Sequence, residues 1–284
     1  MLQHPEVTGA LCTKTKIVTD DPATLPPQDI VLVTVKAHAL TAAAPAIGKL
    51  LKPDGVAVFL LNGIPWWFQH GYKGATGTLP LLDPEGALWR EVKPERTLGC
   101  VVFSPNDMVE PGVIVHTGTK RWIIGEPDGS SSPRLKRVHD LLSEAGFETT
   151  ASPRIRHDIW YKLWGNMTMN PVSAITGATG DRMLDDDLVR NFCSAAMVEA
   201  AAIGAKIGCV IDQDPEARHD LTRKLGAFKT SMLVDAERGK PIELDALVTS
   251  VHELGKRTGV PTPYIDALLG LTRLFAQTHK LLPA

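Results

Sequence analysis

Residues 161–171 read YKLWGNMTMNP, and this stretch decides how the rest of the chain is interpreted. In a helix, Lys162, Asn166 and Asn170 lie four residues apart along one face. Burying such polar groups without partners costs ~1–3 kcal/mol each, so a core helix would carry leucine at these positions. We therefore expect this face to line a cleft in which a ligand completes the contacts. The alternative is a helix that crosses a polar interface between two domains.

The composition is that of an ordinary globular protein. The chain has 284 residues, 44% hydrophobic and 22% charged, which allows one large or two ordinary domains. The formal net charge of −2 argues against a general nucleic-acid-binding protein. The sequence has no run of 18 apolar residues and no N-terminal basic segment followed by an apolar one. We therefore expect a cytoplasmic protein that binds neither nucleic acid nor membrane.

The cysteines and histidines give no sign of a metal site. Cys12, Cys100, Cys193 and Cys209 lie far apart, without a CxxC pair or a Cys/His cluster. The nine histidines show no HExxH pattern. The sequence predicts buried, reduced thiols and no bound metal.

The first half of the chain has the pattern of a parallel α/β layer. Residues 29–36 (DIVLVTVK) form a continuous β-branched run, typical of a strand buried on both faces. The Ala/Leu-rich segment 38–51 predicts a helix, and residues 55–61 (GVAVFLL) predict a second buried strand. This order of strand, helix and strand indicates parallel pairing. A partial strand is also expected at 11–19.

Shorter elements follow a loop-rich stretch at 64–95. Ser132-Pro133 predicts a helix start with an N-cap serine and a proline at the first position, and Gly146 predicts the end of that helix. Strands are expected at 97–103, 112–117, 121–125 and 147–150. The turns between the first three of these predict antiparallel additions to the sheet.

After Pro153 the strand patterns stop and helical patterns take over. Helices are expected at 154–175, 186–208, 214–237, 243–258 and 263–279. The predicted fold class is therefore α/β, with a sheet domain over residues 1–152 and an all-helical domain over residues 153–284.

Polar residues stand at the ends of the two predicted parallel strands. Lys36 ends the first strand and Asn62 follows the second. Ligands of open α/β sheets bind outside the carboxyl ends of the strands, so both side chains are expected near a ligand. The alternatives are a solvated strand end for Lys36 and a simple turn for Asn62-Gly63.

Chemistry can be assigned to the helical half as well. Burial can lower the pKa of a lysine such as Lys162, which could then donate a proton to a developing alkoxide. Asn166 and Asn170 can bind a carboxylate, carbonyl or hydroxyl. In a second polar cluster, Ser231 is expected late in one helix and Glu243 at the start of the next, where the helix dipole alone would favour an acid.

Several segments together resemble the ketopantoate reductase (2-dehydropantoate 2-reductase) family. They are VTVKA at 33–37, LNG at 61–63, PGVIVH at 111–116, KLWGNMTMNP at 162–171, KTSMLVDAERGKPIELDAL at 229–247 and GVPTPYIDAL at 259–268. The resemblance covers nearly the whole chain in order. It implies a Rossmann-type domain followed by a helical domain, with NADPH-dependent reduction of a 2-keto acid in the cleft between them. It is also compatible with a homodimer.

The resemblance implies a role for each candidate residue of the substrate site. Lys162 corresponds to the proton-donating lysine of the family. Asn166, Asn170 and Ser231 correspond to its substrate-binding residues. Asn62 corresponds to the asparagine that contacts both substrate and cofactor. The NGIPWW variant at 62–67 resembles a divergent subgroup, so the family resemblance does not fix the substrate.

The cofactor side departs from the family at its start. Lys36, Asn62 and Glu243 correspond to cofactor-binding residues, but the GxGxxG loop that holds the pyrophosphate occurs nowhere in the sequence. The resemblance thus predicts an N-terminally truncated Rossmann-type sheet, arising either from a start site further upstream or from a short paralogue. The alternative function is a non-catalytic ligand-binding or dimerisation module that is deficient in cofactor binding.

Overall fold

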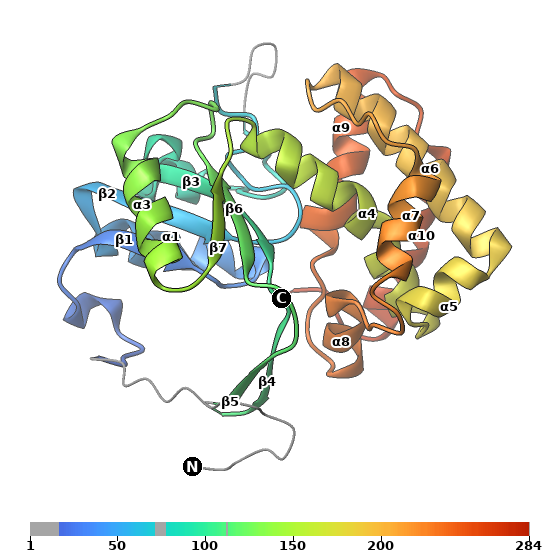
Figure 1. Cartoon of the computed structure of the whole chain (residues 1–284), viewed down its shortest axis with the longest axis horizontal. Helices are drawn as coiled ribbons and strands as arrows, with labels where there is room; N and C mark the ends of the chain where they lie inside the picture. The colour runs from blue at the N-terminus through green and yellow to red at the C-terminus, as the bar shows by residue number, and fades with distance from the viewer. Residues whose placement is uncertain (1–16, 72–77, 112, 284) are drawn as a thin grey trace.

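The structure, a computed structural model, describes residues 17–71, 78–111 and 113–283. A sheet layer with flanking helices lies on one side and a group of helices on the other, and the long helix α4 (Ile155–Thr176) runs between them (Figure 1). Of the partial strand expected at 11–19, residues 17–19 are not in a strand and the others lie outside the described residues.

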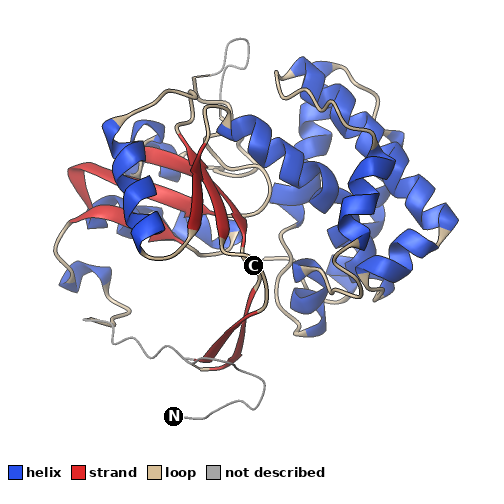
Figure 2. Cartoon of the chain, in the orientation of Figure 1, coloured by secondary structure: helices blue, strands red, loops and turns tan. Residues whose placement is uncertain are grey.

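The main sheet is mixed, with the described strand order β1-β2-β3-β6-β7 (Figure 2). Its strands are β1 (Gln28–Val33), β2 (Leu51–Leu60), β3 (Thr97–Phe103), β6 (Arg121–Gly125) and β7 (Glu148–Ala151). The pairs β1–β2 and β2–β3 are parallel. The first pair confirms the prediction from the two apolar runs. The strand at 97–103 was expected as an antiparallel addition, and its pairing with β2 shows that this prediction is wrong, because the long connection after β2 allows a parallel crossover. β6 runs antiparallel to β3, and β7 parallel to β6.

Both faces of the sheet are covered by helices, which explains why its central strands have no polar face. Ala57 and Phe59 of β2 pack in the core on the side of α1 (Leu40–Leu50). Val56 and Val58 point the other way, into the core beneath α3 (Pro133–Glu144). The start of α3 is as predicted, because the Ser132 hydroxyl accepts the Leu135 N–H at 3.1 Å.

A second strand prediction is also wrong in its pairing. The segment expected at 112–117 forms β5 (Val113–His116), which pairs with β4 (Asn106–Glu110) in a separate hairpin and not with the main sheet. Met108 and Ile114 of this hairpin are exposed, so it lacks the buried face that would hold it against the sheet. Two short turns of helix, α2 (Ala87–Glu91) and Pro94–Arg96, interrupt the stretch predicted as loop.

All described elements after Ala151 are helical. They are α4, α5 (Gly180–Asp185), α6 (Asp187–Lys206), α7 (Pro215–Arg223), α8 (Ser231–Glu237), a π-helical turn at Asp245–Thr249, α9 (Ser250–Thr258) and α10 (Pro263–Thr278). The single helix expected over 214–237 is wrong. Gly226 has a φ of 67° and the Thr230 hydroxyl caps a new helix, so the segment divides into α7 and α8. The short helix α5 was not predicted.

Helix α4 is the element on which the two parts meet. It packs against β3 and β6 on one side and against α6, α8 and α10 on the other. At its start, Ile155 lies so close to Gly99 and Gly125 that a side chain at either glycine would overlap it. The part of α4 that follows Ile155 therefore lies at the edge of the sheet.

Two further expectations can be compared with the described residues. Cys100, Cys193 and Cys209 are buried free thiols, as predicted, whereas Cys12 lies outside the described residues. Within the described ranges, α6 is long and apolar enough by composition to cross a membrane, although no apolar run of that length was expected. It packs against α4, α5, α7, α9 and α10, which accounts for its buried apolar residues, whereas Leu188 and Val198 are exposed.

Candidate active site

Lys162 lies where the sheet and the helices meet. Its Nζ donates hydrogen bonds to Asn62 Oδ1 at 2.8 Å and to the Val102 carbonyl oxygen at 2.6 Å. The same Nζ lies 5.4 Å from the centroid of the Phe103 ring. Asn62 follows β2, while Val102 and Phe103 end β3. One lysine of α4 therefore joins the carboxyl ends of two neighbouring parallel strands, the edge where α/β proteins bind ligands.

The surroundings of Lys162 favour release of its proton. Burial lowers its pKa from 10.5 to about 8, although Cys100 and Glu243 act in the opposite direction. Both hydrogen-bond acceptors of the ammonium are neutral oxygens, and among the described residues no carboxylate lies within ion-pair distance of it. The side chain is still mostly protonated at neutral pH, and it can give up its proton more readily than an ordinary lysine.

Lys162, Asn166 and Asn170 form a polar stripe along one face of α4. Its two asparagines remain available to a ligand. Asn170 is 5% exposed, and its Nδ2 has no hydrogen-bond partner among the described residues. Asn166 is partly exposed, and within the described ranges its side chain makes no hydrogen bond. A buried amide left without a partner costs ~1–3 kcal/mol. An orphaned amide one helical turn from Asn166 and two from Lys162 points to a ligand along this face.

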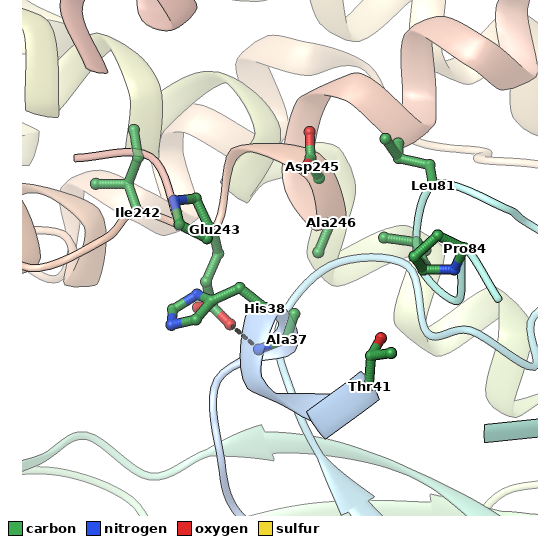
Figure 3. A pocket seen from close by; sticks show the side chains of 11 residues that line it. Ala37, His38, Thr41, Leu81, Pro84, Ile242, Glu243, Asp245 and Ala246 are labelled. Atoms are coloured by element: carbon green, nitrogen blue, oxygen red, sulfur yellow. Dashed lines mark hydrogen bonds between the residues drawn. The ribbon is translucent and has the colours of Figure 1, made fainter. Parts of the chain in front are cut away.

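A second lysine, Lys36, is held very differently. Its Nζ lies 2.6 Å from Asp235 Oδ2 and 3.5 Å from Glu243 Oε2. Burial disfavours the charged form of Lys36, but the charge of Glu243 and the hydrogen bond and charge of Asp235 outweigh it, so its pKa is raised. The other oxygen of Glu243 accepts the Ala37 N–H at 3.1 Å (Figure 3). These contacts join the end of β1 to α8 and to the turn before α9.

The loop after β2 is fixed on the turn that follows Glu243. The Ile64 N–H donates to the Ala246 carbonyl oxygen at 2.8 Å. Gly63 has a φ of 80°, and a side chain there would collide with the same carbonyl. Only glycine suits this approach, which sets Asn62 and Glu243 in a fixed relation.

A cavity of about 170 Å³ adjoins Glu243 (Figure 3). Its walls include Ala37 and His38 from the 3-10 turn before α1, Thr41 from α1, and Ala246 from the π-helical turn. Pockets for whole ligands usually measure roughly 300–1,000 Å³. This cavity could therefore hold one end of a dinucleotide but not all of it.

Ser231 is not where the sequence suggested. It is the first residue of α8 and is exposed, instead of lying late in a helix. The sequence reasoning also missed Asp235, one turn further along α8, although its i+4 spacing from Ser231 was a usable signal. Both residues belong to α8, a helix that packs against α4. Lys162 and Asn62 are in direct contact; Lys36 and Glu243 form the neighbouring cluster.

Both the sheet part and the helical part of the chain match known sequences. Residues 2–129 match the sequence profile of the family described as ketopantoate reductase PanE/ApbA, and residues 154–276 match the profile of its C-terminal part. The chain belongs to the ketopantoate reductase family. Its sheet part is the Rossmann-like domain of that family, and its helical part is the C-terminal domain.

Individual relatives support this assignment. The chain is 41% identical over 251 residues to a 2-dehydropantoate 2-reductase of Mesorhizobium japonicum, covering 88% of this chain and 77% of the relative. A solved structure from Ralstonia solanacearum MolK2, provisionally described as a ketopantoate reductase, is 51% identical with a TM-score of 0.89; the alignment covers 93% of this chain and 81% of that one. The 2-dehydropantoate 2-reductase of Geobacter metallireducens GS-15 is 26% identical with a TM-score of 0.76, over 89% and 79% of the two chains. The chain is thus an oxidoreductase of the ketopantoate reductase type.

Proposed function

We propose that the protein reduces a 2-keto acid of the 2-dehydropantoate type to the 2-hydroxy acid with NADPH. The observation that carries this proposal is Lys162, whose pKa is about 8 and whose ammonium is held by two neutral oxygens at the carboxyl ends of β2 and β3. Reduction of a ketone needs a proton for the developing alkoxide, and a group that titrates near neutral pH supplies it best.

The residues around Glu243 fit the nicotinamide end of the cofactor. A cavity large enough for one ring lies against Glu243, and Lys36 is 41% exposed beside it. We assign Glu243, Lys36 and Asn62 to holding this end. Bound NADPH would supply the hydride. The turn from Val33 into α1 carries no glycine, so it does not provide the glycine-rich cradle that usually binds a pyrophosphate.

The substrate roles follow from the stripe on α4. Lys162 gives its proton to the carbonyl oxygen of the substrate, and Asn62 keeps the ammonium aimed at that position. Asn166, Asn170 and Ser231 bind the carboxylate and hydroxyl end of the substrate. The unpartnered Nδ2 of Asn170 supports this role, because a ligand oxygen would satisfy it.

Three further assignments belong to the same proposal. We infer that the division into two domains falls near residue 152, between β7 and α4. We further infer that the protein works in the cytoplasm and forms a homodimer.

Cofactor binding tests the proposal against a non-catalytic ligand-binding or dimerisation module. The purified 284-residue chain is titrated with NADPH and with NADH while the melting temperature is recorded, since a ligand of the native state raises it by mass action. We expect stabilisation by NADPH and oxidation of NADPH with ketopantoate or another branched 2-keto acid. Folded protein that neither responds to NADPH nor turns over any of these acids would contradict the proposal.

A further inference from the structure

Arg121 contacts the same aromatic ring as the proposed proton donor, and the proposed function gives it no role. It is the first residue of β6 and pairs in register with Phe103, the last residue of β3. Its Cζ lies 5.4 Å from the centroid of the Phe103 ring, and Lys162 Nζ lies at the same distance from that centroid. The two cationic groups are therefore separated by at most twice 5.4 Å. Because β6 is antiparallel to β3, its start lies at the ligand-binding edge of the sheet.

The guanidinium of Arg121 is free to bind an anion. In the described part of the chain, no carboxylate lies within ion-pair distance of it, and the residue is exposed. Other arginines of the surface have their forks occupied. Arg238 binds both oxygens of Asp107 at 2.8 and 2.7 Å, and Arg134 binds Glu126 through Nε and Nη2. Arg121 contacts an aromatic ring instead, which holds the guanidinium near the cleft and leaves its N–H groups available.

The proposed substrate needs such a group. A 2-keto acid carries a carboxylate directly bonded to the reacting carbonyl, but Asn166, Asn170 and Ser231 are neutral. The charge of Lys162 is lost when its proton moves. A path from Lys162 through the carbonyl oxygen and a carboxylate oxygen to a guanidinium nitrogen consists of three steps of roughly 3 Å each. That length agrees with the upper bound set by the Phe103 ring.

We infer that Arg121 binds the substrate carboxylate through its guanidinium fork and thereby selects 2-keto acids over neutral carbonyl compounds. The inference rests on the proposed function, and it adds to the site a positive charge that, unlike that of Lys162, stays when the proton is transferred. The asparagines and Ser231 then serve the remaining carboxylate lone pairs and the hydroxyl of the substrate.

The test compares an acid with its neutral analogue. Initial rates of NADPH oxidation are measured with 2-oxoisovalerate and with its amide, for the wild type and for Arg121→Met, Arg121→Lys and Arg137→Met. Arg137 is a matched control, because it is an exposed arginine on α3 that lies 3.7 Å from Asp29. Loss of a charged hydrogen-bonded pair should raise KM for the acid roughly 10- to 100-fold in Arg121→Met. The kinetics with the amide should change by less than about threefold.

Rescue separates binding from a structural role. Free guanidinium at millimolar concentration should restore part of the acid activity of Arg121→Met, and Arg121→Lys should retain more than Arg121→Met because it keeps the charge without the fork. Equal losses with acid and amide, or unchanged kinetics in Arg121→Met, would overturn the inference.

A binding measurement keeps this inference distinct from the proposed function. If none of the keto acids tested supports NADPH oxidation by the wild type, the proposed function fails. The role of Arg121 is then judged by the melting temperature in the presence of oxamate and of oxamide. Stabilisation by oxamate that is lost in Arg121→Met and kept in Arg137→Met would support the carboxylate site. Stabilisation that is the same in both variants, or absent from the wild type, would overturn it.

Discussion

Lys36 and Lys162 both lie near the carboxyl ends of the parallel strands, and their hydrogen-bond partners differ in charge. Lys36 contacts two carboxylates, Asp235 and Glu243, and its pKa is raised. Lys162 donates hydrogen bonds to the neutral oxygens of Asn62 and Val102, and burial lowers its pKa to about 8. The same side chain thus keeps its proton more firmly at one position than in solution and less firmly at the other, where we assign it the role of proton donor.

The comparison shows what the protein does with charge near the cleft. Carboxylates are kept beside the lysine that joins β1 to α8, and amide and carbonyl oxygens beside the lysine assigned to proton transfer. Glu243 acts on both pKa values, but it lies within ion-pair distance of Lys36 only. This contrast can be tested by replacing either lysine or by placing a carboxylate next to Lys162.

Removal of the proton donor should have the largest effect. Lys162→Met should lower kcat for keto acid reduction at least about 100-fold, the usual scale for loss of a general acid. The fold should survive, because the substitution removes a buried charge. Lys229→Met is a control, since Lys229 is exposed and paired with Glu237 on the outside of α8. Turnover of Lys162→Met close to the wild-type value would remove the role from this residue.

Conversion of Asn62 to aspartate should make Lys162 resemble Lys36. A carboxylate about 2.8 Å from Nζ, where Asn62 Oδ1 now lies, favours the ammonium and should raise its pKa by roughly one to three units. Reduction uses the protonated lysine, so kcat/KM of the wild type should fall as the pH rises through about 8. In Asn62→Asp this fall should move to higher pH, as measured in pH profiles of NADPH oxidation. An unshifted profile would contradict the assignment of the titrating group.

Loss of Lys36 should have a smaller effect, mainly on stability. Lys36→Met leaves Asp235 and Glu243 without their cation, but Lys36 is 41% exposed, so water compensates in part. We expect the free energy of unfolding to fall by about 1–2 kcal/mol, less than the 3–5 kcal/mol of a fully buried pair. Urea unfolding measures the loss, with Lys52→Met of the exposed Lys52–Asp29 pair as control. A loss no larger than that of the control would show that the carboxylates do not need Lys36.

Much of the fold could be predicted because it follows from residue patterns within single strands and helices. The apolar runs of β1 and β2 are continuous since helices cover both faces of the sheet, and Ser132-Pro133 caps α3 as its residue types require. The i, i+4 spacing of Lys162, Asn166 and Asn170 is retained in α4. Each of these features depends on neighbours within a few residues or on a period of the pattern.

The rest depended on contacts between distant residues. The backbone carbonyl of Val102, which holds Lys162, has no sequence signature. The break between α7 and α8 depends on a left-handed Gly226, although a glycine within a helical pattern is often tolerated. Asp235 could be recognised as a partner of Lys36 only once α8 was seen against the end of β1.

A titration of the two lysines tests the central contrast most directly. Protein labelled with ¹³C at lysine Cε is followed by NMR from pH 6 to pH 12, and the signals are assigned with Lys162→Met and Lys36→Met. The contrast between the two lysines predicts that Lys162 titrates with a midpoint of about 8 and that Lys36 titrates above the ordinary value of 10.5. A midpoint for Lys162 near 10.5, or equal midpoints for the two lysines, would contradict it.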